Sequence, residues 1–216
     1  MSPVRPTAAM PGKRPRTPAG PQNADDRPGV VAAGERRPLR EGPEIRFVPA
    51  TAVDDHGTML IKAVGYDHPD AVRLVEAIQQ EVVERYGGPD ETPVSVADFA
   101  PPRGLFLVGY VDGTAVACAG WRSHGEHGED AELKRMYVVP SARGNGYARR
   151  LLAEIERTAR EAGRRRVILE TGDRQPEAVA LYRSAGYTDV EPFGLYACAP
   201  ESIHLGKVLK EPAPAG

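Results

Sequence analysis

The fold is decided by residues 131–162, which read AELKRMYVVPSARGNGYARRLLAEIERTAREA. The apolar run from Leu133 to Val139 predicts a mostly buried strand, and Pro140 ends it because proline cannot continue a central ladder. After a glycine-containing turn, a helix is predicted because apolar side chains recur at helical spacing, at Ala148, Leu151, Leu152, Ile155, Ala159 and Ala162. The stretch therefore predicts a strand, a tight loop and an amphipathic helix.

The turn itself, Arg143-Gly144-Asn145-Gly146-Tyr147-Ala148, carries the chemistry of this stretch. Its glycines let backbone N–H groups approach a ligand closely, and a helix N-terminus favours negative charge, so the turn suits a phosphate. A P-loop would need lysine followed by serine or threonine here, and the dinucleotide fingerprint has another spacing. The loop alone is equally compatible with a plain strand-to-helix turn.

The rest of the pattern alternates between strands and helices. Helices are predicted from Asp70, as the capping residue, to about Tyr86, and again from Pro176 to Ala185. The other expected strands are 44–48, 105–111, 114–121, 166–171, 187–190 and 203–209, with a hairpin turn at Asp112-Gly113. This order predicts an α+β fold with a sheet of mixed direction.

Composition narrows the classes of protein. The chain has 216 residues, 41% of them hydrophobic and 27% charged, which fits one soluble domain with an extension. A net charge of −2 gives no support for nucleic acid as a partner, and no apolar run is long enough for a membrane span. Two cysteines, Cys118 and Cys198, give no disulfide framework, so a cytoplasmic location is predicted.

Three regions are expected along the chain. Residues 1–44 are rich in Pro, Gly, Ala and Arg without periodicity, which predicts a disordered tail. Residues 45–210 form the predicted folded domain, and 211–216 a flexible end. The segment Ser123–Asp130 contains histidines and acids, but its glycines and its lack of a fixed third ligand favour a solvated hairpin loop over a metal site.

The motif from Leu133 to Leu152 resembles the acetyl-CoA-binding motif of the GNAT family of N-acetyltransferases, which reads Arg/Gln-x-x-Gly-x-Gly/Ala between its fourth strand and third helix. The resemblance continues through Arg166–Glu170, Pro176–Ala185 and Gly186-Tyr187, and it covers about residues 45–210. It implies a mixed, mostly antiparallel, twisted sheet of about six to seven strands flanked by helices. In that family the fourth and fifth strands splay apart and leave a slot for the pantetheine arm.

The resemblance also implies an activity. It predicts an N-acetyltransferase that moves the acetyl group of acetyl-CoA to a primary amine by direct attack in a ternary complex. Acetyl-CoA would be a co-substrate, with no tightly bound cofactor and no metal. The loop 89–102 corresponds to a region that often borders the acceptor in this family, but nothing in the sequence identifies that acceptor.

The same resemblance assigns the residues that hold acetyl-CoA. The pyrophosphate would bind Arg143 and the amides of Gly144, Asn145, Gly146, Tyr147 and Ala148. Backbone groups of Met136 and Val138 would pair with the pantetheine arm, and an amide near Tyr137 would face the oxyanion. Gln175 stands where the family commonly has an asparagine, and it offers a similar amide on a longer stem.

Two catalytic residues are implied. Tyr182 matches the family's tyrosine on its fourth helix and would protonate the leaving thiolate, although a core tyrosine on an apolar helix face would look the same. Glu132, at the start of the central strand, is the candidate base, acting directly or through water; a surface or salt-bridging carboxylate is equally compatible.

The sequence is also compatible with two other classes of protein. One is a non-catalytic acetyl-CoA sensor on the same fold, and the other is an interaction domain whose glycine loop binds no nucleotide. The expected partners are acetyl-CoA and an amine, without nucleic acid or membrane. A homodimer, common in the family, is compatible with the sequence but has no readable interface.

Overall fold

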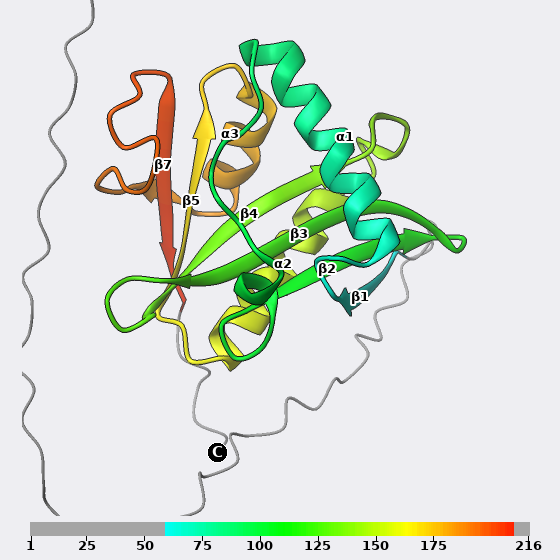
Figure 1. The fold of residues 1–216 in the computed structure, drawn as a ribbon, viewed down its shortest axis with the longest axis horizontal. Helices are drawn as coiled ribbons and strands as arrows, with labels where there is room; N and C mark the ends of the chain where they lie inside the picture. Colours follow the sequence, from blue (N-terminus) through cyan, green and yellow to red (C-terminus); the bar gives the residue numbers. More distant parts are fainter. Residues whose placement is uncertain (1–58, 210–216) are drawn as a thin grey trace, which may run out of the picture. The chain divides into compact units, whose positions relative to one another are not determined.

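A seven-stranded sheet with the strand order β1-β2-β3-β4-β5-β7-β6 runs through the computed structural model, which describes residues 59–209 (Figure 1). The strands are β1 (Leu60–Val64), β2 (Gly104–Val111), β3 (Thr114–His124), β4 (Asp130–Val138), β5 (Arg166–Gly172), β6 (Thr188–Asp189) and β7 (Ser202–Val208). The helices are α1 (Pro69–Tyr86), α2 (Tyr147–Glu161) and α3 (Pro176–Ser184), with short 3₁₀ turns η1 (Val96–Phe99) and η2 (Pro140–Ala142). Only β4 and β5 pair in parallel. The predicted mixed, mostly antiparallel sheet is confirmed.

Helices cover both faces of this sheet. The α2 stripe of Leu151, Leu152 and Ile155 is fully buried in one core, together with the partly buried apolar residues of α3. Trp121 of β3 lies in the same core, where its indole Nε1 donates to Thr158 Oγ1 at 3.1 Å. On the opposite face, α1 packs over β2–β4 and forms the second core (Figure 1).

The sheet opens between β4 and β5, as the family resemblance implies. Their ladder is limited to three pairs, from Asp130–Arg166 to Glu132–Ile168, and the strands then diverge (Figure 1). β5 instead pairs with β7 along its whole length, and β4 with β3. A bulge in β4 at Arg135, whose φ is +56°, interrupts the β3 ladder where the gap begins. This opening leaves room for a ligand inside the sheet.

Several predictions from the sequence need correction, and others concern residues outside the described range. The helix predicted to begin at Asp70 begins at Pro69, and His68 is the capping residue, because its Nδ1 accepts from the Asp70 amide at 3.2 Å. β1 forms within residues 51–68, where the sequence suggests a turn and a short helix and no strand. The strand expected at 44–48, the tail 1–44 and the end 211–216 lie outside the described residues. Within residues 59–209, no helix is both long and apolar enough to span a membrane.

Candidate active site

Two cavities meet at Met136 of β4. The first, the loop cavity, has a volume of about 380 Å³ and is lined by the glycine turn, the start of α2 and parts of α1 and α3. The second, the gap cavity, has about 400 Å³ and lies between the diverging ends of β4 and β5. Five residues line both: Ile78, Val82, Met136, Gln175 and Tyr182. Because they share these walls, a long ligand in the first cavity can present its end to the second.

The glycine turn has the geometry of an anion site. Gly144 and Gly146 have φ values of +83° and +75°, in the left-handed region that other residues rarely adopt. No atom lies within 4 Å of where a Cβ would stand on either glycine, so their backbone is open to a ligand. The first turn of α2 contains no acidic residue to oppose an anion. The main-chain amides here therefore fit a diphosphate.

Arg143 and Asn145 support this turn in ways the sequence did not reveal. The Arg143 guanidinium donates to the Val138 carbonyl at 3.0 Å and forms a 2.5 Å ion pair with Glu81 of α1. The Asn145 side-chain amide donates to the carbonyls of Ala142 at 3.1 Å and Arg143 at 3.3 Å. Asn145 thus braces the loop and is not part of the cavity wall, whereas Arg143 remains at its rim.

The other residues assigned to acetyl-CoA come together around the loop cavity. Its walls include Met136, Tyr137, Val138, Gly144, Gly146, Tyr147, Ala148 and Gln175. Gln175 directly precedes α3, and its side-chain oxygen accepts from Thr171 Oγ1 at 3.4 Å. The longer glutamine stem is therefore anchored to β5 while it lines both cavities.

Tyr182 stands where the two cavities meet. Its side chain is 6% exposed, and its hydroxyl donates to the sulfur of Met136 at 3.5 Å. Burial raises the pKa of Tyr182 well above that of a free tyrosine. The hydroxyl therefore keeps its proton at neutral pH and has one to donate.

Glu132 lies away from the gap cavity wall. Its carboxylate is 4% exposed and accepts from Arg122 Nε at 2.7 Å, with Lys134 Nζ at 3.6 Å. His124 Nδ1 lies 3.7 Å from the same carboxylate. These contacts are those of the salt-bridging alternative, and they occupy the carboxylate that a base would need.

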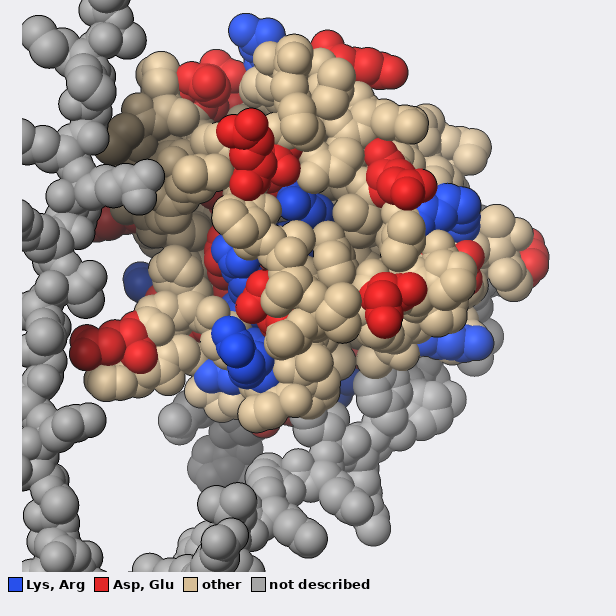
Figure 2. All heavy atoms as spheres, in the orientation of Figure 1, with Lys and Arg blue, Asp and Glu red and all other residues tan. Residues whose placement is uncertain are grey.

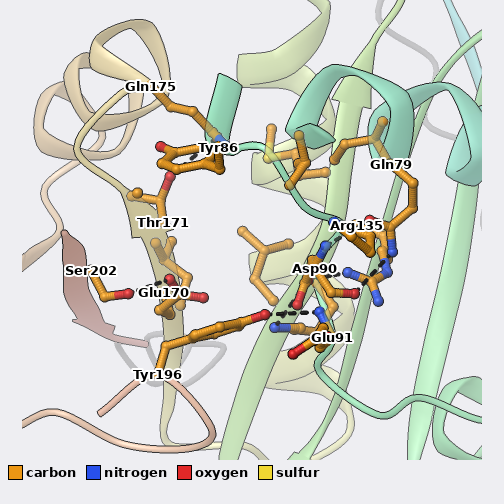
Figure 3. Close-up of a pocket in the computed structure, with 18 of the residues that line it drawn as sticks. Gln79, Tyr86, Asp90, Glu91, Arg135, Glu170, Thr171, Gln175, Tyr196 and Ser202 are labelled. Atoms are coloured by element: carbon orange, nitrogen blue, oxygen red, sulfur yellow. Dashed lines mark hydrogen bonds and ion pairs between the residues drawn. The ribbon is translucent and has the colours of Figure 1, made fainter. Parts of the chain in front are cut away.

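Glu170 is a carboxylate in the gap cavity that the sequence analysis did not single out. It lies on β5, opposite His204 in the β5–β7 ladder, and accepts from Ser202 Oγ at 3.0 Å (Figure 3). Burial raises the pKa of Glu170 above that of an ordinary carboxyl group, and the charge of Lys134 only partly offsets this. The available signal was an acid at the end of the buried run Val167–Leu169, on the strand that borders the opening.

An ionic cluster faces Glu170 across the gap cavity (Figure 3). Asp90, from the loop after α1, forms an ion pair with Arg135, and Lys134 Nζ lies 3.9 Å from its carboxylate. Burial alone would raise the pKa of Asp90, but the two cations and hydrogen bonds from Thr92 outweigh it and lower this pKa. The loop 89–102, expected near the acceptor, does line the cavity through its first residues.

We expect Asp90→Asn to lower the free energy of unfolding by about 2 kcal/mol at neutral pH, because Arg135 would lose its buried counter-charge. Since the folded pKa of Asp90 is lowered, its contribution is present above the unfolded value and disappears as the pH falls through the folded one. The difference between variant and wild type in urea unfolding should therefore shrink below about pH 4. A difference that does not change down to pH 2 would contradict this assignment.

Acidic and basic side chains are interleaved on the face of the molecule shown in Figure 2. Among the described residues, no group of three or more His, Cys, Asp or Glu side chains is arranged to hold a metal ion.

Comparison with known proteins agrees with this geometry. Residues 75–187 match the Acetyltransferase (GNAT) family, over about half of the chain. The chain belongs to the GNAT acetyltransferase family. The predicted family, fold and enzyme class are thereby confirmed.

Individual proteins similar to this chain are also described as acetyltransferases or acyltransferases. An "IAA acetyltransferase" of Azospirillum brasilense is 38% identical over 64% of this chain and 90% of its own. A structure described as an acyl-CoA N-acyltransferase, from Klebsiella pneumoniae, is 27% identical with a TM-score of 0.60, covering 72% of this chain and all of its own. At 17% identity, yncA of Salmonella typhimurium, solved with its cofactor acetyl-CoA, shares the fold with a TM-score of 0.54, over 74% of this chain and 98% of its own.

Proposed function

We propose that this GNAT enzyme transfers the acetyl group of acetyl-CoA to a primary amine by direct attack in a ternary complex. The observation that carries the proposal is the junction of two cavities at Met136 and Tyr182, one beside the glycine turn and one inside the sheet. The loop cavity suits the diphosphate and pantetheine arm of the donor, and the gap cavity suits the acceptor. The acetyl-CoA bound to yncA supports the same donor for this fold.

Each wall of the loop cavity has a role in holding the donor. The amides of Gly144–Ala148 and the rim guanidinium of Arg143 bind the diphosphate. The backbone of Met136 and Val138, freed from β5 by the splay, pairs with the amides of the pantetheine arm. The thioester then lies beside the bulge in β4, where an amide near Tyr137 faces the developing oxyanion.

The transfer removes two protons from an ammonium acceptor and supplies one to the leaving thiolate. The ammonium gives up one proton, directly or through water, to a carboxylate, and the free amine then attacks the thioester carbonyl, forming the C–N bond. The C–S bond breaks as the tetrahedral intermediate collapses, and the Tyr182 hydroxyl protonates the thiolate. The nitrogen then loses its second proton, and the tyrosinate recovers one readily because the pKa of Tyr182 is raised.

Two carboxylates, Glu132 and Glu170, are candidates for the base. Replacing each of them with glutamine distinguishes between the two candidates. Glu170→Gln should lower kcat by about a hundredfold, because Glu170 lines the acceptor cavity and its raised pKa suits a base. The wild-type rate should fall as the pH drops through this raised pKa, since only the ionised carboxylate accepts a proton. Glu170→Gln should remove that acid limb from the pH profile of kcat.

Glu132→Gln is the matched variant, and it tests the prediction from the sequence that Glu132 is the base. If Glu132 has a structural role, this variant lowers the melting temperature through its lost pair with Arg122 and leaves the shape of the pH profile unchanged. If instead it flattens the pH profile and Glu170→Gln does not, Glu132 is the base.

The activity itself is tested by screening primary amines with acetyl-CoA and following release of the free thiol. Saturable thiol release that requires both an amine and acetyl-CoA, with a monoacetylated product found by mass spectrometry, supports the transferase. Tight acetyl-CoA binding without transfer to any amine would instead favour the regulatory sensor on the same fold. No rise in melting temperature with acetyl-CoA would favour the interaction domain.

A further inference from the structure

The gap cavity has an uneven set of charges. Four carboxylates line it, from Asp90, Glu91, Glu170 and Glu201, against the two cations of Lys134 and Arg135. Which of these charges a ligand can use depends on the partners that each already has. The cations and the carboxylates of the cavity differ sharply in the partners that they have.

Both cations already have carboxylate partners. The Arg135 side chain is 5% exposed, and its guanidinium is paired with Asp90 and donates to the Thr92 carbonyl at 3.4 Å. The Lys134 side chain is 6% exposed; its Nζ donates to Thr92 Oγ1 at 3.3 Å and lies between the Glu132 and Asp90 carboxylates. A ligand carboxylate would have to displace these buried contacts to find a cation here.

The remaining carboxylates are unpaired. Glu170 accepts from the neutral hydroxyl of Ser202, and no cation of residues 59–209 lies within ion-pair distance of it. The same holds, within that range, for Glu91 and Glu201. Tyr86 and Tyr196 also line the cavity, and Figure 3 shows the Tyr196 side chain reaching across from the Glu170 side toward Glu91. Aromatic ring faces attract cations.

Each hydroxyl of these two tyrosines accepts one backbone hydrogen bond. Tyr86 accepts from the Arg174 amide at 3.0 Å, and Tyr196 accepts from the Glu91 amide at 2.8 Å. Each ring is thus held in place by a hydrogen bond at its tip, and the Arg174 guanidinium lies 5.7 Å from the centre of the Tyr86 ring. Each hydroxyl keeps its own O–H, which is a neutral donor. The unpaired charges of the cavity are therefore anionic, and the Tyr196 ring lies beside them.

We propose that the acceptor is an amine cation that carries no carboxylate beside its nitrogen, and that Glu170 binds its ammonium group. This inference rests on the proposed function, because it takes the gap cavity as the acceptor site. A carboxylate next to the amine would enter beside Glu170 without a free cation to receive it. Free α-amino acids acetylated at their α-nitrogen are then poor acceptors, whereas simple amines and amino amides are good ones.

The test compares matched ligands by calorimetry on the full chain saturated with coenzyme A, where no transfer can occur. The sets are tyramine, tyrosinamide and tyrosine, then isoamylamine, leucinamide and leucine. In at least one set we expect the amine and amide to bind with similar Kd and the amino acid at least tenfold more weakly. An amino acid that binds as well as its amide in both sets, or no binding by any of the six, would overturn the inference.

Variants locate the site of this selectivity. Glu170→Gln should weaken amine binding at least tenfold and reduce the preference over the amino acid, while its affinity for coenzyme A reports that it is folded. Glu126→Gln, which removes the same charge from an exposed loop, should change neither value. Selectivity that survives Glu170→Gln intact would overturn the assignment to Glu170.

The inference and the transferase can fail separately. Selective amine binding without thiol release from acetyl-CoA supports this binding class and defeats the transferase. Efficient acetylation of free amino acids at the α-nitrogen, in preference to their amides, supports the transferase and overturns the inference.

Discussion

Gly146→Val should weaken acetyl-CoA binding by roughly a hundredfold or more. Gly146 has a φ of +75° and lies at the start of α2, so valine must either strain the backbone or move it out of the left-handed region. Either change turns the amides of the loop away from the diphosphate, and each hydrogen bond to a charged group contributes about 1.5–3 kcal/mol. Losing two of them corresponds to the expected change in Kd, which titration calorimetry measures.

Gly163→Val is the matched control at the other end of the same helix. Gly163 has a φ of +78°, has no atom within 4 Å of a would-be Cβ, and lines neither cavity. Both variants should therefore lower the melting temperature to a similar extent, but only the one at Gly146 should lose acetyl-CoA. Equal retention of acetyl-CoA by both variants would show that the glycine turn does not bind it.

Tyr182→Phe should lower kcat by about a hundredfold, the usual range for loss of a general acid, with the Kd for acetyl-CoA nearly unchanged. The phenylalanine ring fills the same buried space, and the lost hydroxyl contacts only the sulfur of Met136 among the described residues. Single-turnover kinetics with acetyl-CoA and a good amine substrate measures the change in the chemical step.

Tyr187→Phe provides the comparison. The Tyr187 ring lies 5.7 Å from that of Tyr182 and is equally deep in the core, but it lines neither cavity. Its kcat should stay within about twofold of wild type. If Tyr182→Phe behaves the same way, Tyr182 is a core tyrosine and the thiolate takes its proton from solvent.

Local chemistry made much of this fold predictable. The period of Leu151, Leu152 and Ile155 predicts the buried face of α2, and the structure confirms it. Asp112-Gly113 predicts the β2–β3 hairpin for a similarly local reason. A two-residue hairpin turn needs a positive φ at both central residues, and Asp and Gly adopt it readily. The glycine turn was recognisable because two glycines beside a helix start are needed for open amides.

The rest depends on contacts between distant parts of the chain. The ion pair of Arg143 with Glu81 spans 62 positions, and that of Arg135 with Asp90 spans 45. No local sequence pattern predicts such pairs. The ion pairs of the cations in the gap cavity therefore could not be predicted from the sequence. Glu170 was missed for the same reason: its position in the cavity follows from the divergence of β4 and β5.

The central claim is that main-chain amides after Pro140 bind the diphosphate of acetyl-CoA and direct its thioester into the opening of the sheet. A crystal structure of the enzyme with coenzyme A tests it most directly. The account predicts diphosphate oxygens within hydrogen-bond distance of the amides of residues 144–148 and the sulfur beside Tyr182. A diphosphate bound elsewhere, with this turn left free, would contradict it.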